Sequence, residues 1–129
     1  MRFSKPILLV GIAALIVSSC TKDRKDPEIV IKNPENHSEH VMGTTIEVDA
    51  TFKDDQELSW YKVYIGEESG TLTPDFSYQV EENISGKSFD FSATISIPTG
   101  IESVYYLHVE LKDAEQKTAT TKLMLHFTE

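Results

Sequence analysis

Phe89-Asp90-Phe91-Ser92-Ala93-Thr94-Ile95-Ser96-Ile97 is the stretch of sequence that decides the fold. Apolar and polar side chains alternate along it with a period of two, which is typical of a β-strand with one buried and one exposed face. The same alternation recurs in residues 46–52 and 105–111. Almost nothing after Pro27 repeats at about 3.6 residues, as an amphipathic helix would. The sequence therefore predicts an all-β domain.

Seven short strands are expected in all, separated by turns rich in Gly, Pro, Asn and Asp. They cover residues 29–31, 46–52, 58–65, 76–80, 89–97, 105–111 and 119–127. This spacing predicts a seven-stranded Greek-key β-sandwich of the immunoglobulin or fibronectin type III class. Tyr105, two residues before the inward-facing Leu107, stands where such folds carry a tyrosine corner.

A secretory signal precedes the strands. Basic residues at the start, an apolar stretch and then small residues follow the usual order of such a signal. The segment Val17-Ser18-Ser19-Cys20 resembles the lipobox of bacterial lipoproteins, in which an aliphatic residue and two small residues precede a cysteine. The resemblance implies that residues 1–19 are removed and that Cys20, the only cysteine of the chain, carries lipid.

The lipid would hold the mature protein on a membrane without a spanning helix. The apolar stretch before Cys20 is shorter than the roughly 20 residues that a spanning helix needs. Two or three acyl chains on one residue suffice for stable attachment. We therefore expect residues 20–26 to tether a single sandwich domain, residues 27–129, to the cell envelope.

Composition argues against several classes of function. The net charge of −9 disfavours nucleic acid as a partner, because phosphates must be neutralised by Lys and Arg. Once Cys20 is lipidated, the domain has no thiol for a disulfide, for thiol catalysis or for a cysteine zinc site. The sequence contains no Gly-x-Ser-x-Gly elbow and no glycine-rich phosphate loop. We therefore expect no enzymatic activity.

A connected set of short motifs runs along the domain: Pro27-Glu28-Ile29, Phe52-Lys53-Asp54-Asp55, Tyr61-Lys62-Val63, Ile84-Ser85-Gly86-Lys87, Ile97-Pro98 and Tyr106-Leu107-His108-Val109. In these motifs residues 27–127 resemble the small immunoglobulin-like lipoproteins of Bacteroidetes, which are grouped as a domain of unknown function. The resemblance implies an immunoglobulin-like fold and a lipid-anchored protein of the outer membrane. Many members carry a histidine-rich insertion after the third strand. Residues 66–70 replace it here and contain no histidine, so the resemblance does not transfer a metal role.

Two groups of side chains could bind a metal ion. His37 and His40 lie three residues apart between the first and second expected strands, where two imidazoles could hold zinc or copper. Asp54, Asp55 and Asp113 lie in turns that gather at one end of such a sandwich, where they could offer calcium its oxygen ligands. The other interpretations are a solvated polar loop for the histidines and ordinary turn residues for the acids. No cofactor besides calcium or zinc is expected.

A binding face is the remaining candidate. Alternation directs Tyr64, Tyr106 and His108 to the outer face of the third and sixth strands. Trp60 is out of phase with the inward residues of its strand, so it also faces outward unless a bulge re-aims it. Exposed aromatic rings on a sheet are typical of a contact surface. Alternatively, residues 66–75 fold over these rings. The sequence thus predicts a membrane-anchored envelope lipoprotein that binds an envelope protein or a glycan without catalysis, with a metal-handling lipoprotein as the alternative.

Overall fold

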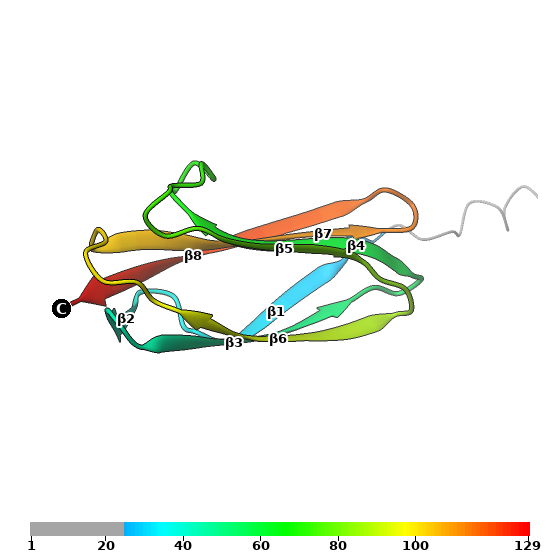
Figure 1. Ribbon diagram of the computed structural model, residues 1–129. Helices are drawn as coiled ribbons and strands as arrows, with labels where there is room; N and C mark the ends of the chain where they lie inside the picture. Colours follow the sequence, from blue (N-terminus) through cyan, green and yellow to red (C-terminus); the bar gives the residue numbers. More distant parts are fainter. Residues whose placement is uncertain (1–24) are drawn as a thin grey trace, which may run out of the picture.

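The computed structural model describes residues 25–129, which form two stacked β-sheets and contain no helix (Figure 1). The expected signal, Cys20 and most of the tether lie outside the described residues. The strands are β1 (Glu28–Asn33), β2 (Ser38–Val41), β3 (Thr45–Lys53), β4 (Leu58–Gly66), β5 (Tyr78–Asn83), β6 (Ser88–Ser96), β7 (Val104–Asp113) and β8 (Thr118–Thr128). The prediction of an all-β sandwich is confirmed, and the count is eight strands rather than seven.

The two sheets differ in width. One has the order β1-β3-β6, and the other has the order β2-β8-β7-β4-β5. All neighbouring strands are antiparallel except β2 and β8, which are parallel. The chain therefore leaves the three-stranded sheet after β1 and joins the edge of the five-stranded sheet as β2. This short strand lies where the sequence predicted a loop.

The core lies between the sheets and follows the predicted alternation. Ile46, Val48, Ala50 and Phe52 are all inward on β3 and at most 4% exposed. Phe52 is fully buried against the rings of Tyr61, Phe89 and Phe91, with centroids 5.3 to 6.3 Å apart. A second aromatic cluster, nearer the other end of the sandwich, joins Phe76, Tyr105 and Phe127. With one cysteine in the chain, this packing is what stabilises the domain.

Two local features set the orientation of the candidate residues. The register between β4 and β7 shifts between Leu58 and Trp60, so Leu58 and Tyr61 both face the core while Trp60 faces outward. At the start of β7, the hydroxyl of Tyr105 accepts a hydrogen bond of 3.3 Å from the backbone N–H of Glu102. This is the contact expected of a tyrosine corner.

Candidate functional site

The outer faces of the two sheets are chemically different. On the three-stranded sheet the outward residues of β3 and β6 are mostly Ser, Thr, Asp and Glu, and hydroxyls pair with carboxylates across the strands. Ser92 donates to Asp49 at 2.9 Å, and Thr94 donates to Glu47 at 3.0 Å. No aromatic side chain faces outward from this sheet within the described residues. The outward-facing aromatic rings lie on the five-stranded sheet.

The pairing of β4 with β7 assembles the predicted binding face. Tyr64 is opposite His108, and Trp60 is opposite Lys112. The rings of Tyr64 and His108 stack with centroids 4.7 Å apart and planes only 9° apart. The hydroxyl of Tyr64 donates to Glu110 at 3.1 Å. Burial and this hydrogen bond raise the pKa of Tyr64.

The prediction that Tyr64 and His108 are exposed is wrong, because the segment between β4 and β5 folds over them. Tyr64 is 9% exposed and His108 is 8% exposed. The backbone carbonyl of Glu67 lies 2.7 Å from Nε2 of His108. Gly70, with a positive φ of 95°, comes so close that an added Cβ would lie 3.1 Å from the Tyr64 hydroxyl. The alternative, in which residues 66–75 cover the rings, therefore holds for this half of the face.

Trp60 and Tyr106 remain half-exposed on either side of the covered pair. The indole N–H of Trp60 donates to Glu81 at 2.9 Å, and Lys112 lies over its ring at 5.5 Å from the centroid. Lys122 lies over the ring of Tyr106 at 5.7 Å. Each of these contacts is near the surface, so it contributes little to stability and can rearrange.

Lysines recur beside the rings of this face. Lys62 is 4.9 Å from the centroid of Tyr64, in addition to the lysines beside Trp60 and Tyr106. In a protein whose net charge is −9, these three lysines on one sheet face give it a locally mixed charge. We call the side chains of Trp60, Lys62, Tyr106, Lys112 and Lys122 the ring–lysine face.

Two of the acids predicted as calcium ligands, Asp54 and Asp113, bind the turns that carry them. Asp54 accepts hydrogen bonds from the backbone N–H groups of Gln56 and Glu57, at 3.0 and 2.9 Å. Asp113 accepts from two backbone N–H groups in the β7–β8 turn, at 2.9 and 2.8 Å. Both therefore close turns, and Asp55 is exposed. Among residues 25–129, no group of three or more His, Asp or Glu side chains is placed to hold a metal ion.

The structure also separates His37 from His40. In the parallel pairing of β2 with β8, His40 is next to the buried Phe127, and its ring packs on Phe127 with centroids 5.9 Å apart. His40 is hydrogen-bonded to the hydroxyl of Ser38 at 2.8 Å, and burial lowers its pKa. The two predicted ligands therefore lie apart, because the ring of His40 packs on the buried Phe127, whereas His37 precedes β2 and is exposed. His37 instead meets His126, a partner that sequence reasoning did not find.

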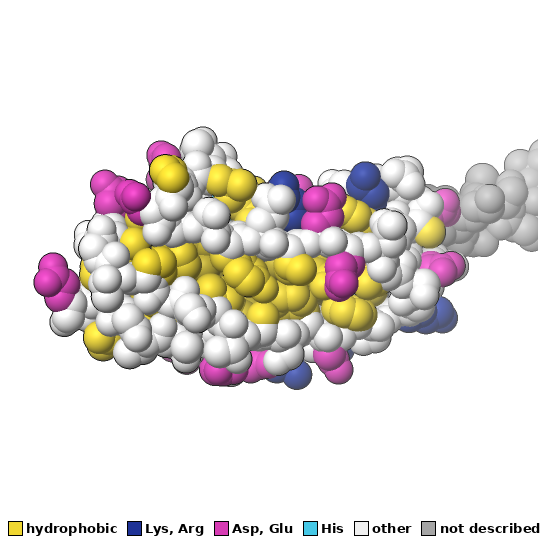
Figure 2. All heavy atoms as spheres, viewed as in Figure 1, with side chains coloured by type: hydrophobic (Ala, Val, Ile, Leu, Met, Phe, Trp, Pro, Cys, Tyr) yellow, Lys and Arg dark blue, Asp and Glu magenta, His cyan; other side chains and the backbone are white. Residues whose placement is uncertain are grey.

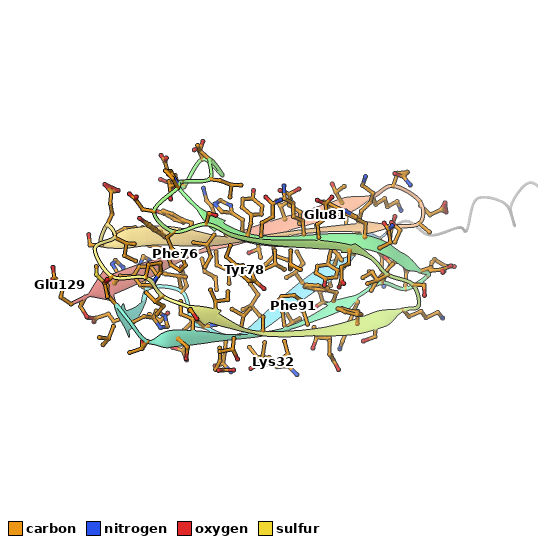
Figure 3. The ribbon with its side chains drawn as sticks, viewed as in Figure 1. Lys32, Phe76, Tyr78, Glu81, Phe91 and Glu129 are labelled. Carbon is orange, nitrogen blue, oxygen red and sulfur yellow. The ribbon has the colours of Figure 1, made fainter. Side chains whose placement is uncertain are left out.

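A band of hydrophobic side chains is visible along the edge where β5 and β6 face each other (Figure 2). Tyr78, Val80, Phe89 and Ala93 are only partly buried there. Tyr78 and Phe91 lie between the two sheets (Figure 3). Glu81 projects outward from the five-stranded sheet, and Lys32 projects outward from the three-stranded sheet (Figure 3). Next to this band, the hydroxyl of Tyr61 donates to Glu82 at 2.5 Å. Burial raises the pKa of Tyr61, and this hydrogen bond raises it further. The sequence did not predict this surface because alternation does not show which sheet edges stay uncovered.

No helix within residues 25–129 has the length and apolarity needed to cross a bilayer.

Comparison with known proteins gives a family. Residues 17–127 match DUF4625, described as a domain of unknown function. The chain belongs to the DUF4625 family. The matched region contains nearly all of the sandwich together with the segment around Cys20. No curated protein sequence matches the chain.

Two solved structures with a similar fold are of one protein, OgpA from Akkermansia muciniphila. The crystal structure of wild-type OgpA from Akkermansia muciniphila has a TM-score of 0.53 and 18% identity, covering 80% of this chain. Catalytically inactive OgpA in complex with an O-glycopeptide substrate (glycodrosocin) gives a TM-score of 0.51 at the same identity. This chain spans only 29% of the length of OgpA. The similarity therefore concerns the fold of one part of that protein.

Proposed function

We propose that this protein is a lipid-anchored lipoprotein of the cell envelope whose sandwich binds an envelope protein or a glycan without catalysis. The observation that carries the proposal is the asymmetry between the two sheets. One outer face is a closed ladder of hydroxyl–carboxylate hydrogen bonds. The other carries half-buried rings with lysine side chains lying over them, the kind of surface that contacts a partner.

The proposed anchor is Cys20. The match to DUF4625 covers residues 17–127, a range that includes Val17 and Cys20. Pro27 is buried where the domain begins, which leaves residues 20–26 as a short tether. An acidic domain is repelled by anionic lipid headgroups, so attachment would depend on the lipid rather than on the protein surface. The outer membrane is the proposed location, in keeping with the resemblance to Bacteroidetes lipoproteins.

The finer fold class is also a proposal. An immunoglobulin or fibronectin type III assignment is supported by the sheet containing β8-β7-β4 packed on the sheet β1-β3-β6. The hydrogen bond of Tyr105 to the backbone at the start of β7 supports it further. Domains of this class are common carriers of binding surfaces on sheet faces and end loops. Fold analogy alone does not identify the ligand.

Binding would use Trp60 and Tyr106 as the apolar contacts. Lys112 and Lys122 lie over these rings on long, flexible side chains, so a partner could displace them and then pair with their ammonium groups. The covered pair Tyr64–His108 would act as a rigid platform between the two rings, because stacking and the β4–β5 segment hold it. A glycan or a protein surface with apolar and acidic groups fits this arrangement.

Site-specific photo-crosslinking in intact cells tests the proposal. A photoreactive phenylalanine replaces Trp60 on β4 in one strain and Thr94 in another. Thr94 is a matched control because it is exposed near the middle of β6 on the opposite outer face. We expect a discrete adduct, protein or glycan, from position 60 and none from position 94. Equal capture from both positions, or none from either, would contradict the proposed face.

A further inference from the structure

His37 and His126 come together at the edge of the five-stranded sheet although 89 residues separate them in sequence. Nδ1 of His37 lies 3.5 Å from Nε2 of His126. The ring centroids are 5.7 Å apart and the ring planes differ by 23°. Because the nitrogens are much closer than the centroids, the two rings present nitrogen edges to each other.

The backbone holds this pair in place. The N–H of His37 donates to the carbonyl of Met124 at 2.7 Å, and the side chain of Asn36 accepts from the N–H of Met124 at 2.8 Å. His37 itself has a positive φ of 67°, which is uncommon for a residue other than glycine. The fold therefore keeps His37 in a left-handed conformation that points its ring at β8, and such conformations are enriched at functional sites.

The strand next to His126 carries a carboxylate on the same outer face. Glu39 is the register partner of His126 in the parallel β2–β8 pair, and it faces outward like His126. His37, Glu39 and His126 line one surface hollow of about 360 Å³, together with Ser103, Phe127 and Thr128. The rest of the hollow is open to solvent, so water can complete a coordination shell.

We propose that His37 and His126 chelate a divalent transition-metal ion, with water completing the coordination shell and Glu39 joining it only after its side chain moves. A tetrahedral ion with metal–nitrogen bonds of about 2.0–2.1 Å places two imidazole nitrogens about 3.4 Å apart. The observed 3.5 Å matches this separation. Only one proton fits between the facing nitrogens, and a metal ion would take its position. Glu39 becomes a ligand by rotating its exposed side chain toward the pair.

The chemistry of the ligands selects the ion. The observed nitrogen separation fits tetrahedral Zn²⁺ directly. Cu²⁺ binds such nitrogen and oxygen donors more tightly but prefers tetragonal geometry, with adjacent nitrogens about 2.8 Å apart, so the two rings would move closer together on binding it. Calcium and magnesium prefer oxygen ligands alone. Imidazoles bind metal only when unprotonated, so acidification releases the ion. This site is independent of the ring–lysine face and of the lipid anchor.

The test is titration of the full-length protein, purified without a polyhistidine tag, with Cu²⁺ at pH 7.5. We expect one Cu²⁺ per chain at this site and at least a tenfold weaker association for His37→Ala and for His126→Ala. Glu39→Gln should weaken binding by a few-fold. His40→Ala is the matched control, because His40 lies on the opposite side of β2, and it should bind within twofold of the wild type. Wild-type affinity in His126→Ala, or an equal loss in His40→Ala, would overturn the proposal.

A second measurement does not depend on whether the variants fold. Electron spin-echo modulation of the wild-type protein with one equivalent of Cu²⁺ counts the imidazole nitrogens bound to the ion. Two imidazoles are expected, and zero or one would refute chelation by the pair. Zn²⁺ should displace the Cu²⁺ signal only at a large excess, and lowering the pH to 5.5 should weaken it.

Discussion

Replacing Tyr64 by alanine should lower stability much more than replacing Trp60, although both residues face outward from β4. Tyr64 is 9% exposed, stacks on His108 and donates to Glu110. Trp60 is half-exposed, and its contacts are with surface side chains. The two variants therefore distinguish the part of this sheet face that the β4–β5 segment covers from the part that is open to a partner.

The magnitudes follow from the contacts. Truncating a buried aromatic side chain to alanine in a core costs about 3–5 kcal/mol, and Tyr64 lies under a loop rather than in the core, so about 2–4 kcal/mol is expected. For Trp60, a surface hydrogen bond and one exposed cation–π contact amount to about 1 kcal/mol. A domain of this size is stable by only about 5–15 kcal/mol, so the two losses are easy to distinguish.

The assay is urea unfolding followed by far-UV circular dichroism, because Trp60 is the only tryptophan and its fluorescence is lost in Trp60→Ala. Tyr64→Phe is the control: it keeps the ring and removes only the hydrogen bond to Glu110, at about 0.5–1.5 kcal/mol. A loss below 1 kcal/mol in Tyr64→Ala, or above 3 kcal/mol in Trp60→Ala, would refute the division of the face into a covered and a free part.

Three further substitutions test other parts of the structure. Asp113→Ala leaves the backbone N–H groups of Glu115 and Lys117 without an acceptor and should lower the free energy of unfolding by about 2–3 kcal/mol, whereas a loss under 1 kcal/mol would contradict the turn-closing role. Tyr105→Phe should lose about 0.5–1.5 kcal/mol in the same urea assay if its hydroxyl ties down the start of β7; an unchanged midpoint would argue against a tyrosine corner. Burial lowers the pKa of His40, so near neutral pH the folded state binds fewer protons than the unfolded state. The free energy of unfolding should therefore fall as the pH drops through the ordinary pKa of histidine, about 6.5. His40→Gln should reduce this dependence between pH 7.5 and 5.5, and identical dependences would exclude the contribution of His40.

The sandwich could be predicted from sequence because period-two alternation is a direct consequence of one face packing on a core. Residues 46–52 show this plainly, since every apolar position there is buried. β2 could not be predicted in the same way. It has four residues, its inward positions are Ser38 and His40, and its pairing with β8 is formed by the backbone. No apolar pattern marks a strand that covers so little core.

The candidate site could likewise be predicted only in part. Alternation gives the direction of a side chain, so Trp60 and Tyr106 were placed on the correct face. It does not give the path of a loop, and the cover over Tyr64 and His108 depends on the turn between Gly66 and Thr71. Gly66 permits this turn, because an added Cβ would lie 2.6 Å from the carbonyl oxygen of Thr71.

The histidines show the same limit at longer range. Sequence spacing favoured His37 with His40 because they are three residues apart. Pairing His37 with His126 requires the parallel register of β2 on β8, which joins two segments from opposite ends of the domain. Local spacing carries no information about such a contact.

The central claim is that a lipid on the cysteine at position 20 holds this sandwich at a membrane, where its ring–lysine face can meet a partner. Intact mass spectrometry of the mature protein, extracted from the envelope, tests this most directly. The mass should correspond to a chain that begins at Cys20 and carries diacylglycerol with or without a further acyl chain. A mature chain that begins elsewhere, or that begins at Cys20 with an unmodified thiol, would contradict the claim.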